Sequence, residues 1–209
     1  MNKALIINGH QEYPFAKGAL NQSIAERITS YLHGIGYEIK TTTMKDDWDA
    51  ETEVDKHTWA DVVILQSPAN WMGLPWSYKR YMDEVYTVGM FGKMSENDGR
   101  TAEAPKKHYG RGGVLTNTFY MLSLTFNAPA ESFNDPNDFF EGKSVDDLFF
   151  PQHMNFKFFG MKPLPTFACF DVMKNGDIAN DFKRLEQHLQ AVFTAFGASQ
   201  TQTTSDLDR

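Results

Sequence analysis

The sequence predicts an α/β protein with a doubly wound sheet of five parallel strands in the order 2-1-3-4-5 and helices on both faces. The first observation is that short β-branched apolar runs, such as VVIL at residues 62–65, contain no polar alternation. Such runs are typical of parallel strands buried on both faces. The second observation is that these runs alternate along the chain with longer segments of helical period, as they do in doubly wound sheets.

The first elements form a strand–helix–strand unit. Residues 4–7 (ALII) predict a strand that ends at Asn8 and Gly9. Apolar residues then recur every four positions from residue 19 to about residue 32, which predicts an amphipathic helix followed by terminating glycines. Residues 37–43 predict the second strand.

The middle of the chain adds the third strand. Residues 51–59 predict a short helix that leads into the strand at residues 62–65. Pro68 is expected to lie beyond this strand, because proline has no N–H to donate within a central strand. A helix is expected from Trp76, since Pro75 suits a first helical turn.

The fourth strand follows a long irregular segment. Residues 87–107 are charged and contain glycines, which predicts an exposed excursion with a solvated tip at residues 95–100. Loops of this length within a compact domain are usually functional or disordered. Residues 120–125 (YMLSLT) predict the strand itself.

The remaining residues complete one predicted domain at residues 1–197. Residues 145–159 predict an aromatic-rich helix, residues 163–170 the fifth strand, and residues 180–196 a closing amphipathic helix. Residues 198–209 are polar and low in apolar content, so we expect a disordered C-terminal tail.

Composition excludes several classes of protein. The net charge of −7 argues against a dedicated nucleic-acid binder, because phosphate contacts need basic patches. The one cysteine, Cys169, permits no disulfide framework and fits a reducing compartment. No apolar stretch has the length of a signal peptide or a membrane span, so a soluble cytoplasmic protein is expected. No histidine has metal-ligand spacing with other ligands, so no metal site is expected.

Two turns are expected to form a site for a flat ligand. Residues 69–72 (ANWM) follow the third strand and residues 125–128 (TFNA) follow the fourth, each with polar and aromatic character and a proline close by. Because the carboxyl ends of neighbouring parallel strands meet at one edge of the sheet, these turns should lie side by side. They would then clamp a ring system between them.

The loop at residues 10–18 precedes the first helix, where a phosphate cradle usually lies, since a helix N-terminus has free N–H groups and a positive dipole. The loop matches neither the Walker A motif nor GxGxxG. From the residues alone, a plain surface loop is as good an interpretation as a phosphate cradle.

Nearly the whole chain resembles one family of proteins. The matching segments are GALN at residue 18, WADVVI at 59, WMG at 71, PW at 75, DGRT at 98, MLSLT at 121, NAP at 127 and PLPTF at 163. In combination they resemble the bacterial modulator of drug activity B family, within the flavodoxin-like NAD(P)H:quinone oxidoreductases related to DT-diaphorase.

The resemblance implies a flavodoxin-like FAD-binding domain and a homodimer that reduces quinones by two electrons from NADPH, in a ping-pong mechanism. It implies contacts with FAD along the first loop and helix and along both turns. These residues are His10, Ala16, Lys17, Gly18, Ala19, Leu20, Asn21, Gln22, Ser23, Pro68, Ala69, Asn70, Trp71, Met72, Tyr109, Thr125, Phe126, Asn127 and Ala128. No catalytic side chain is assigned.

Two differences from the family bear on substrate. Asn70 and Phe126 stand where the bacterial family often has larger aromatic residues. The tyrosine–histidine proton relay of the mammalian diaphorases is replaced by Pro136 and Gly142. The alternatives are a flavodoxin-type electron carrier with FMN and a partner protein, and a flavin-free protein that keeps the fold.

Overall fold

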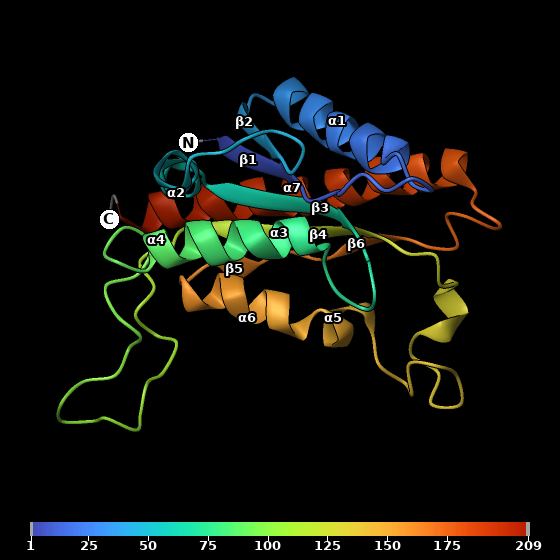
Figure 1. The fold of residues 1–209 in the computed structure, drawn as a ribbon. Helices are drawn as coiled ribbons and strands as arrows, with labels where there is room; N and C mark the ends of the chain where they lie inside the picture. The colour runs from blue at the N-terminus through green and yellow to red at the C-terminus, as the bar shows by residue number, and fades with distance from the viewer. Residues whose placement is uncertain (1, 208–209) are drawn as a thin grey trace.

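The computed structural model describes the backbone of residues 2–207, with side chains up to Ala195 (Figure 1). One sheet lies between two layers of helices. The elements are β1 (Lys3–Asn8), α1 (Ala19–Gly34), β2 (Glu38–Thr43), α2 (Ala50–Trp59), β3 (Val62–Pro68), α3 (Trp76–Tyr81), the π-helix η1 (Met82–Tyr86), α4 (Thr87–Gly89), β4 (Phe119–Thr125), the 3-10 turn η2 (Ala130–Ser132), α5 (Val145–Leu148), α6 (Phe150–Phe158), β5 (Lys162–Pro163), β6 (Phe167–Cys169) and α7 (Ile178–Leu207).

All strand pairs in the sheet are parallel, in the order β2-β1-β3-β4, and both β5 and β6 pair with β4. The predicted order is therefore confirmed, but the predicted fifth strand is divided in two. Two residues of β4 separate Tyr120 from Ser123, whereas three separate their partners Pro163 and Phe167. The extra residue interrupts the ladder as a bulge does. The Pro165 carbonyl there lies 3.1 Å from His188 Nε2 of α7.

The expectation that Pro68 lies beyond the third strand is wrong, because Pro68 is the last residue of β3 and pairs with Thr125. The N–H of Ala69 donates to the Thr125 carbonyl, so the Pro68 nitrogen faces the opposite neighbour, β1. That strand has already ended at Asn8. No ladder hydrogen bond is lost, and proline is tolerated there.

Residues of each strand alternate between two apolar clusters, because successive side chains of a strand point to opposite faces. The first cluster joins Leu5, Val63 and Leu122 to α2, α3, η1 and α6. The second joins Ile6 and Ile64 to α1 and α7. Figure 1 shows these two layers of helices on either side of the sheet.

The segment between η1 and β4 is only partly the predicted excursion. Residues 87–89 continue the helix as α4, and the side chains of Met94 and Ser95 are completely buried. Ser95 also bridges to Gly113, which closes the base of the loop. Residues 96–112 then reach away from the body at the end where the strands begin (Figure 1).

The last helix, α7, continues beyond residue 197 to Leu207. It therefore enters the segment for which the sequence predicts a disordered tail, and residues 208–209 lie outside the described part of the chain. None of the helices that the structure describes is long and apolar enough to cross a membrane.

A buried histidine makes the fold sensitive to acid. His57 of α2 is completely buried, and its Nε2 lies 3.2 Å from the Tyr81 hydroxyl, which in turn donates to Glu53. Burial, with a smaller contribution from the charge of Lys56, lowers the pKa of His57 from 6.5 to about 3. His57 therefore stays neutral in the folded protein where a histidine of the unfolded chain is protonated.

We expect His57→Gln to weaken the pH dependence of folding. Between pH 6.5 and about 3 the unfolded wild-type chain binds one more proton at this residue. The wild-type free energy of unfolding therefore decreases as the pH is lowered through this window, by up to about 1.4 kcal/mol per pH unit from this group. Urea unfolding of the wild type and of His57→Gln between about pH 7 and pH 4 measures, for each protein, the slope of the free energy of unfolding against pH. Equal slopes would contradict the shifted pKa.

Candidate functional site

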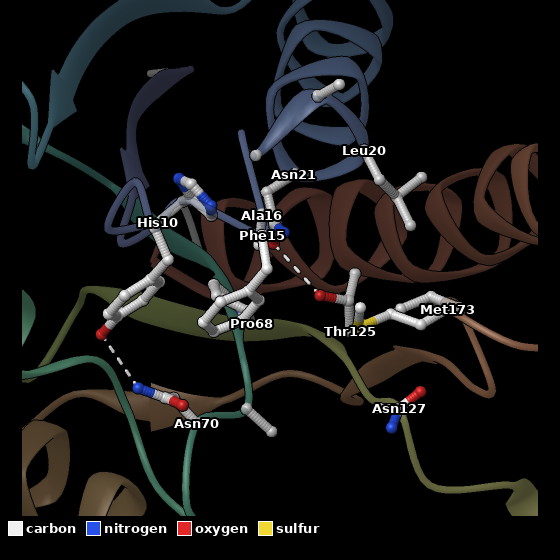
Figure 2. Close-up of a pocket in the computed structure, with 15 residues that line it drawn as sticks. His10, Phe15, Ala16, Leu20, Asn21, Pro68, Asn70, Thr125, Asn127 and Met173 are labelled. Carbon is white, nitrogen blue, oxygen red and sulfur yellow. Dashed lines mark hydrogen bonds between the residues drawn. The ribbon is translucent and has the colours of Figure 1, made fainter.

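A cavity of about 240 Å³ opens at the edge of the sheet where β1, β3 and β4 end (Figure 2). Five segments line it: the loop after β1, the start of α1, the ends of β3 and β4 with the turns that follow them, and the segment between β6 and α7. The lining residues are His10, Tyr13, Phe15, Ala16, Gly18, Ala19, Leu20, Asn21, Pro68, Ala69, Asn70, Thr125, Asn127, Val172 and Met173. The structure thus brings together most of the residues that the sequence analysis assigned to a cofactor.

Four lining residues are absent from the sequence-based assignment. Tyr13 and Phe15 lie in the predicted cradle loop, and their rings stack at 5.5 Å. Aromatic residues in a loop beside a helix start are the signal that points to them. Val172 and Met173 follow β6. No sequence signal identifies Val172 and Met173. Their place beside the cavity depends on how β6 pairs with β4 after the fifth strand is divided.

The first turn of α1 presents unpaired N–H groups to the cavity. Gly18 is the N-cap residue with φ of 80°, and no side chain caps the helix. Within the described part of the chain, the first backbone N–H of this helix to find an acceptor is that of Gln22, which donates to the Gly18 carbonyl. The N–H groups of Ala19, Leu20 and Asn21 are therefore free to bind an anion.

The His10 ring is buried beside this helix end without a hydrogen-bond partner among the described residues, whereas its backbone N–H donates to Asn8 Oδ1. Its side chain is only 3% exposed, and neither ring nitrogen has an acceptor or donor in hydrogen-bonding geometry. Burial and then the charge of Lys45 lower the pKa of His10, while the nearby Ala16 carbonyl opposes the shift. Neutral buried imidazole without a partner is costly, so His10 is suited to a polar group of a ligand.

The loop between β1 and α1 is folded against the turn after β3. Tyr13 and Ala16 exchange two backbone hydrogen bonds, and the Tyr13 hydroxyl accepts from the Asn70 side-chain amide at 2.9 Å. Lys17 instead points outward and pairs with Glu12. The loop therefore forms one wall of the cavity through Tyr13, while its charged residues stay in solvent.

A buried chain of polar side chains lies behind the cavity. The Ser123 hydroxyl donates to Gln66 Oε1 at 2.6 Å, and Gln66 Nε2 donates to Asn21 Oδ1 at 2.7 Å. The Thr125 hydroxyl also donates to Asn21 Oδ1, at 3.3 Å (Figure 2). All four side chains are at least nine-tenths buried, and Asn21 and Thr125 reach the cavity.

The turn after β3 holds its aromatic residue in solvent. Asn70 and Gly73 exchange two backbone hydrogen bonds around Trp71 and Met72, which have φ of 50° and 60°. Residues other than glycine rarely adopt this left-handed conformation. Trp71 is 91% exposed and lies outside the cavity lining. A rigid turn therefore presents a flat apolar ring beside the opening.

The turn after β4 places its residues differently from the prediction. Thr125 and Asn127 line the cavity, whereas Phe126 is buried with Phe133, Phe149 and Phe170. The Phe126 N–H donates to the Cys169 carbonyl of β6 and is not free for a ligand. Phe126 therefore supports the turn from behind, since alternate residues at a strand end point to opposite faces.

The structure does not bring five other predicted residues to the cavity lining. Gln22 and Ser23 follow Asn21 on α1 outside the cavity lining, and Gln22 Oε1 accepts a hydrogen bond from Asn8 Nδ2. Ala128 is half-buried, and its carbonyl accepts from the Asp171 N–H. Met72 lies at the outer turn. Tyr109 belongs to the excursion loop, at the opposite end of the sheet, where its ring contacts Phe158 and Arg100.

The chemistry of this cavity is that of a binding site. It combines hydrogen-bond donors for an anion with apolar walls. Cys169 of β6 is buried, and burial raises its pKa to about 12, so it is no nucleophile. Among the described residues no cluster of His, Cys, Asp and Glu could hold a metal ion.

The fold and the cavity define a flavodoxin-like α/β protein with unpaired N–H groups of a helix terminus at the carboxyl edge of its sheet. The chain belongs to the family described as having a flavodoxin-like fold, whose model matches residues 2–194. It is 40% identical over 189 residues to the NADPH:quinone oxidoreductase MdaB of Haemophilus influenzae, across 90% of this chain and 98% of that protein. The chain therefore belongs to the MdaB family of oxidoreductases, which confirms the resemblance and the expectation of an enzyme of this class.

Solved structures agree on the fold. A putative quinone reductase from Klebsiella pneumoniae superposes with a TM-score of 0.73 at 21% identity, covering 91% of this chain and 84% of that one. General stress protein 14 of Treponema denticola, solved in complex with FMN, has a TM-score of 0.60 at 14% identity, covering 95% and 99%.

Proposed function

We propose that this protein is an FAD-dependent NADPH:quinone oxidoreductase that reduces quinones by two electrons in a ping-pong mechanism. The observation that carries the proposal is the cavity at the carboxyl edge of the sheet. It joins the free N–H groups of α1 to apolar walls, as a phosphorylated flat cofactor requires. The relationship to MdaB supports the choice of NADPH and quinone as substrates.

The residues present fit a flavin. The unpaired N–H groups at the start of α1 and the unpartnered ring of His10 would bind phosphate oxygens. Gly18 lets this backbone approach the His10 ring, since a Cβ there would lie 2.3 Å from it. Bound flavin would supply the hydride chemistry. The chain would bind it, orient it and keep its phosphates away from water.

The exposed ring of Trp71 and the turn at Asn127 would flank the flat part of the cofactor. NADPH and quinone would occupy the same open face in turn, which explains why a single site serves both substrates. Such alternation needs no nucleophilic side chain, and the geometry of the cavity is consistent with that. Asn70 is bound to Tyr13 and so narrows the cavity from one side.

A homodimer is part of the proposal. Tyr109 lies at the opposite end of the sheet from the cavity, so it would meet a flavin only in a second copy of the chain. A partly apolar surface is available for such an assembly, because Tyr86, Met90 and Phe158 line a groove and Phe91, the next residue after Met90, is exposed. Sedimentation of the purified protein measures the oligomeric state.

The absorption spectrum and substrate kinetics of the purified protein test the function. We expect a yellow protein that releases FAD on denaturation and consumes NADPH only when a quinone is added. Parallel double-reciprocal plots are expected for a ping-pong mechanism. A colourless protein that FAD and FMN fail to reconstitute would refute the proposal. Bound FMN without NADPH oxidation would favour the flavodoxin-type electron carrier.

A further inference from the structure

We propose that Ser123, which does not touch the cavity, is a positioning residue that keeps a hydrogen-bond donor of Asn21 directed at the phosphate of the ligand. It acts through Gln66. The inference rests on the proposed function, because the phosphate belongs to a flavin nucleotide. It concerns the chain Ser123–Gln66–Asn21, which we name the amide relay.

The relay transmits orientation because each side-chain amide has a donor end and an acceptor end. Ser123 donates to Gln66 Oε1 at 2.6 Å, so the Nε2 end of Gln66 faces Asn21. That nitrogen donates to Asn21 Oδ1 at 2.7 Å. The acceptor end of Asn21 is thereby turned inward, and its donor end, Nδ2, is left for the cavity that Asn21 lines.

The reverse orientation of both amides also forms the two amide contacts, but it leaves hydroxyl protons without acceptors. Asn21 would then donate to Gln66, and Gln66 would donate to Ser123. Ser123 and Thr125, which are 0% and 2% exposed, would each lose the acceptor of their O–H group. In the described part of the chain neither hydroxyl has another acceptor. Unpaired buried donors are costly, so the two hydroxyls select the observed orientation.

The selected orientation matters because of what surrounds Asn21. Asn21 lies in the first turn of α1, beside the unpaired N–H groups of Ala19 and Leu20. With Nδ2 toward the cavity, every polar group of this helix end is a donor, which suits an anion. In the reverse orientation Oδ1 would face the phosphate oxygens and repel them.

Gln66→Glu is the sharpest test of the relay. The carboxylate still accepts a hydrogen bond from the Ser123 hydroxyl. It has no N–H to donate to Asn21 Oδ1, so it accepts a hydrogen bond from Asn21 Nδ2 instead. Asn21 then presents Oδ1 to the cavity. We expect the affinity of the apoprotein for FAD and FMN to fall by about 10-fold to 100-fold, while riboflavin, which lacks phosphate, binds as it does to the wild type.

Ser123→Ala is the milder second variant, since it removes the hydroxyl that selects the orientation and adds no charge. We expect about 3-fold to 10-fold weaker binding of FAD and FMN, again without a change for riboflavin. Ser67→Ala is the matched control, because the equally buried Ser67 hydroxyl donates only to the Pro68 carbonyl. Its flavin affinities should equal those of the wild type.

Fluorescence titration of each apoprotein with the three flavins gives the dissociation constants, and thermal melting of the apoproteins controls for folding. Equal losses for riboflavin and FMN would overturn the relay, because the effect would then be structural. Unchanged affinities in both relay variants, in proteins that melt like the wild type, would also overturn it and leave the proposed function standing. A wild-type protein that binds none of the three flavins would overturn both proposals.

Discussion

Gly18→Ala is expected to abolish flavin retention and to destabilise the protein more than Gly36→Ala beyond the other end of the same helix. Gly18 has φ of 80°, which costs an alanine about 1–2 kcal/mol. In addition, the new Cβ would lie 2.3 Å from two atoms of the His10 ring. Because His10 is buried and lines the cavity, relieving this clash must shift either its ring or the helix start, and both belong to the cavity wall.

Gly36→Ala is the control for backbone strain alone. Gly36 has φ of 89°, and a Cβ there meets no atom within 4 Å. We expect it to lose about 1–2 kcal/mol of stability and to keep its flavin. In the double variant His10→Ala/Gly18→Ala, the clash is relieved and stability should return to the level of Gly36→Ala. If Gly18→Ala and Gly36→Ala have equal stability and flavin content, His10 is not seated against the helix start as described.

Asn21→Asp is expected to weaken binding of FAD and FMN by about 100-fold, or about 2.8 kcal/mol, without unfolding the protein. One carboxylate oxygen can still accept from Gln66 and Thr125, as Asn21 Oδ1 does. The other replaces the donor Nδ2 with a negative charge. This carboxylate and a flavin phosphate about 4 Å away would repel each other by on the order of 4 kcal/mol at an effective dielectric constant of about 20.

The stability of the Asn21→Asp apoprotein should stay within about 1 kcal/mol of the wild type, because a carboxylate in the first turn of a helix interacts favourably with its dipole. Riboflavin titration separates repulsion of phosphate from general damage to the cavity. A variant that binds FAD as tightly as the wild type would show that the phosphates do not lie at the start of α1.

Local patterns in the sequence were sufficient to predict most of the fold. The apolar runs at β1, β3 and β4 are buried on both faces, so each carries a signal that does not depend on its neighbours. The helix α1 likewise shows its period in the sequence. The division of the fifth strand escaped prediction, because a bulge depends on the register with β4.

The candidate site was predictable only in outline. A strand end followed by a loop and a helix start indicates where a ligand binds, and the cavity lies there. Which side chains face it is a different question. Phe126 and Thr125 are adjacent in sequence, yet one is buried among phenylalanines and the other lines the cavity.

The sequence by itself determined the strand order, the edge of the sheet that carries the site and the family, because these follow from periodicity and from motifs along the chain. Only the tertiary structure decided that His10 lies without a partner against Gly18, that Tyr109 lies at the far end of the sheet, and that Ser123 reaches Asn21 through Gln66. These relations join residues up to about a hundred positions apart, for example Asn21 and Thr125. No local pattern encodes them, since they arise when parallel strands and a helix end are packed together.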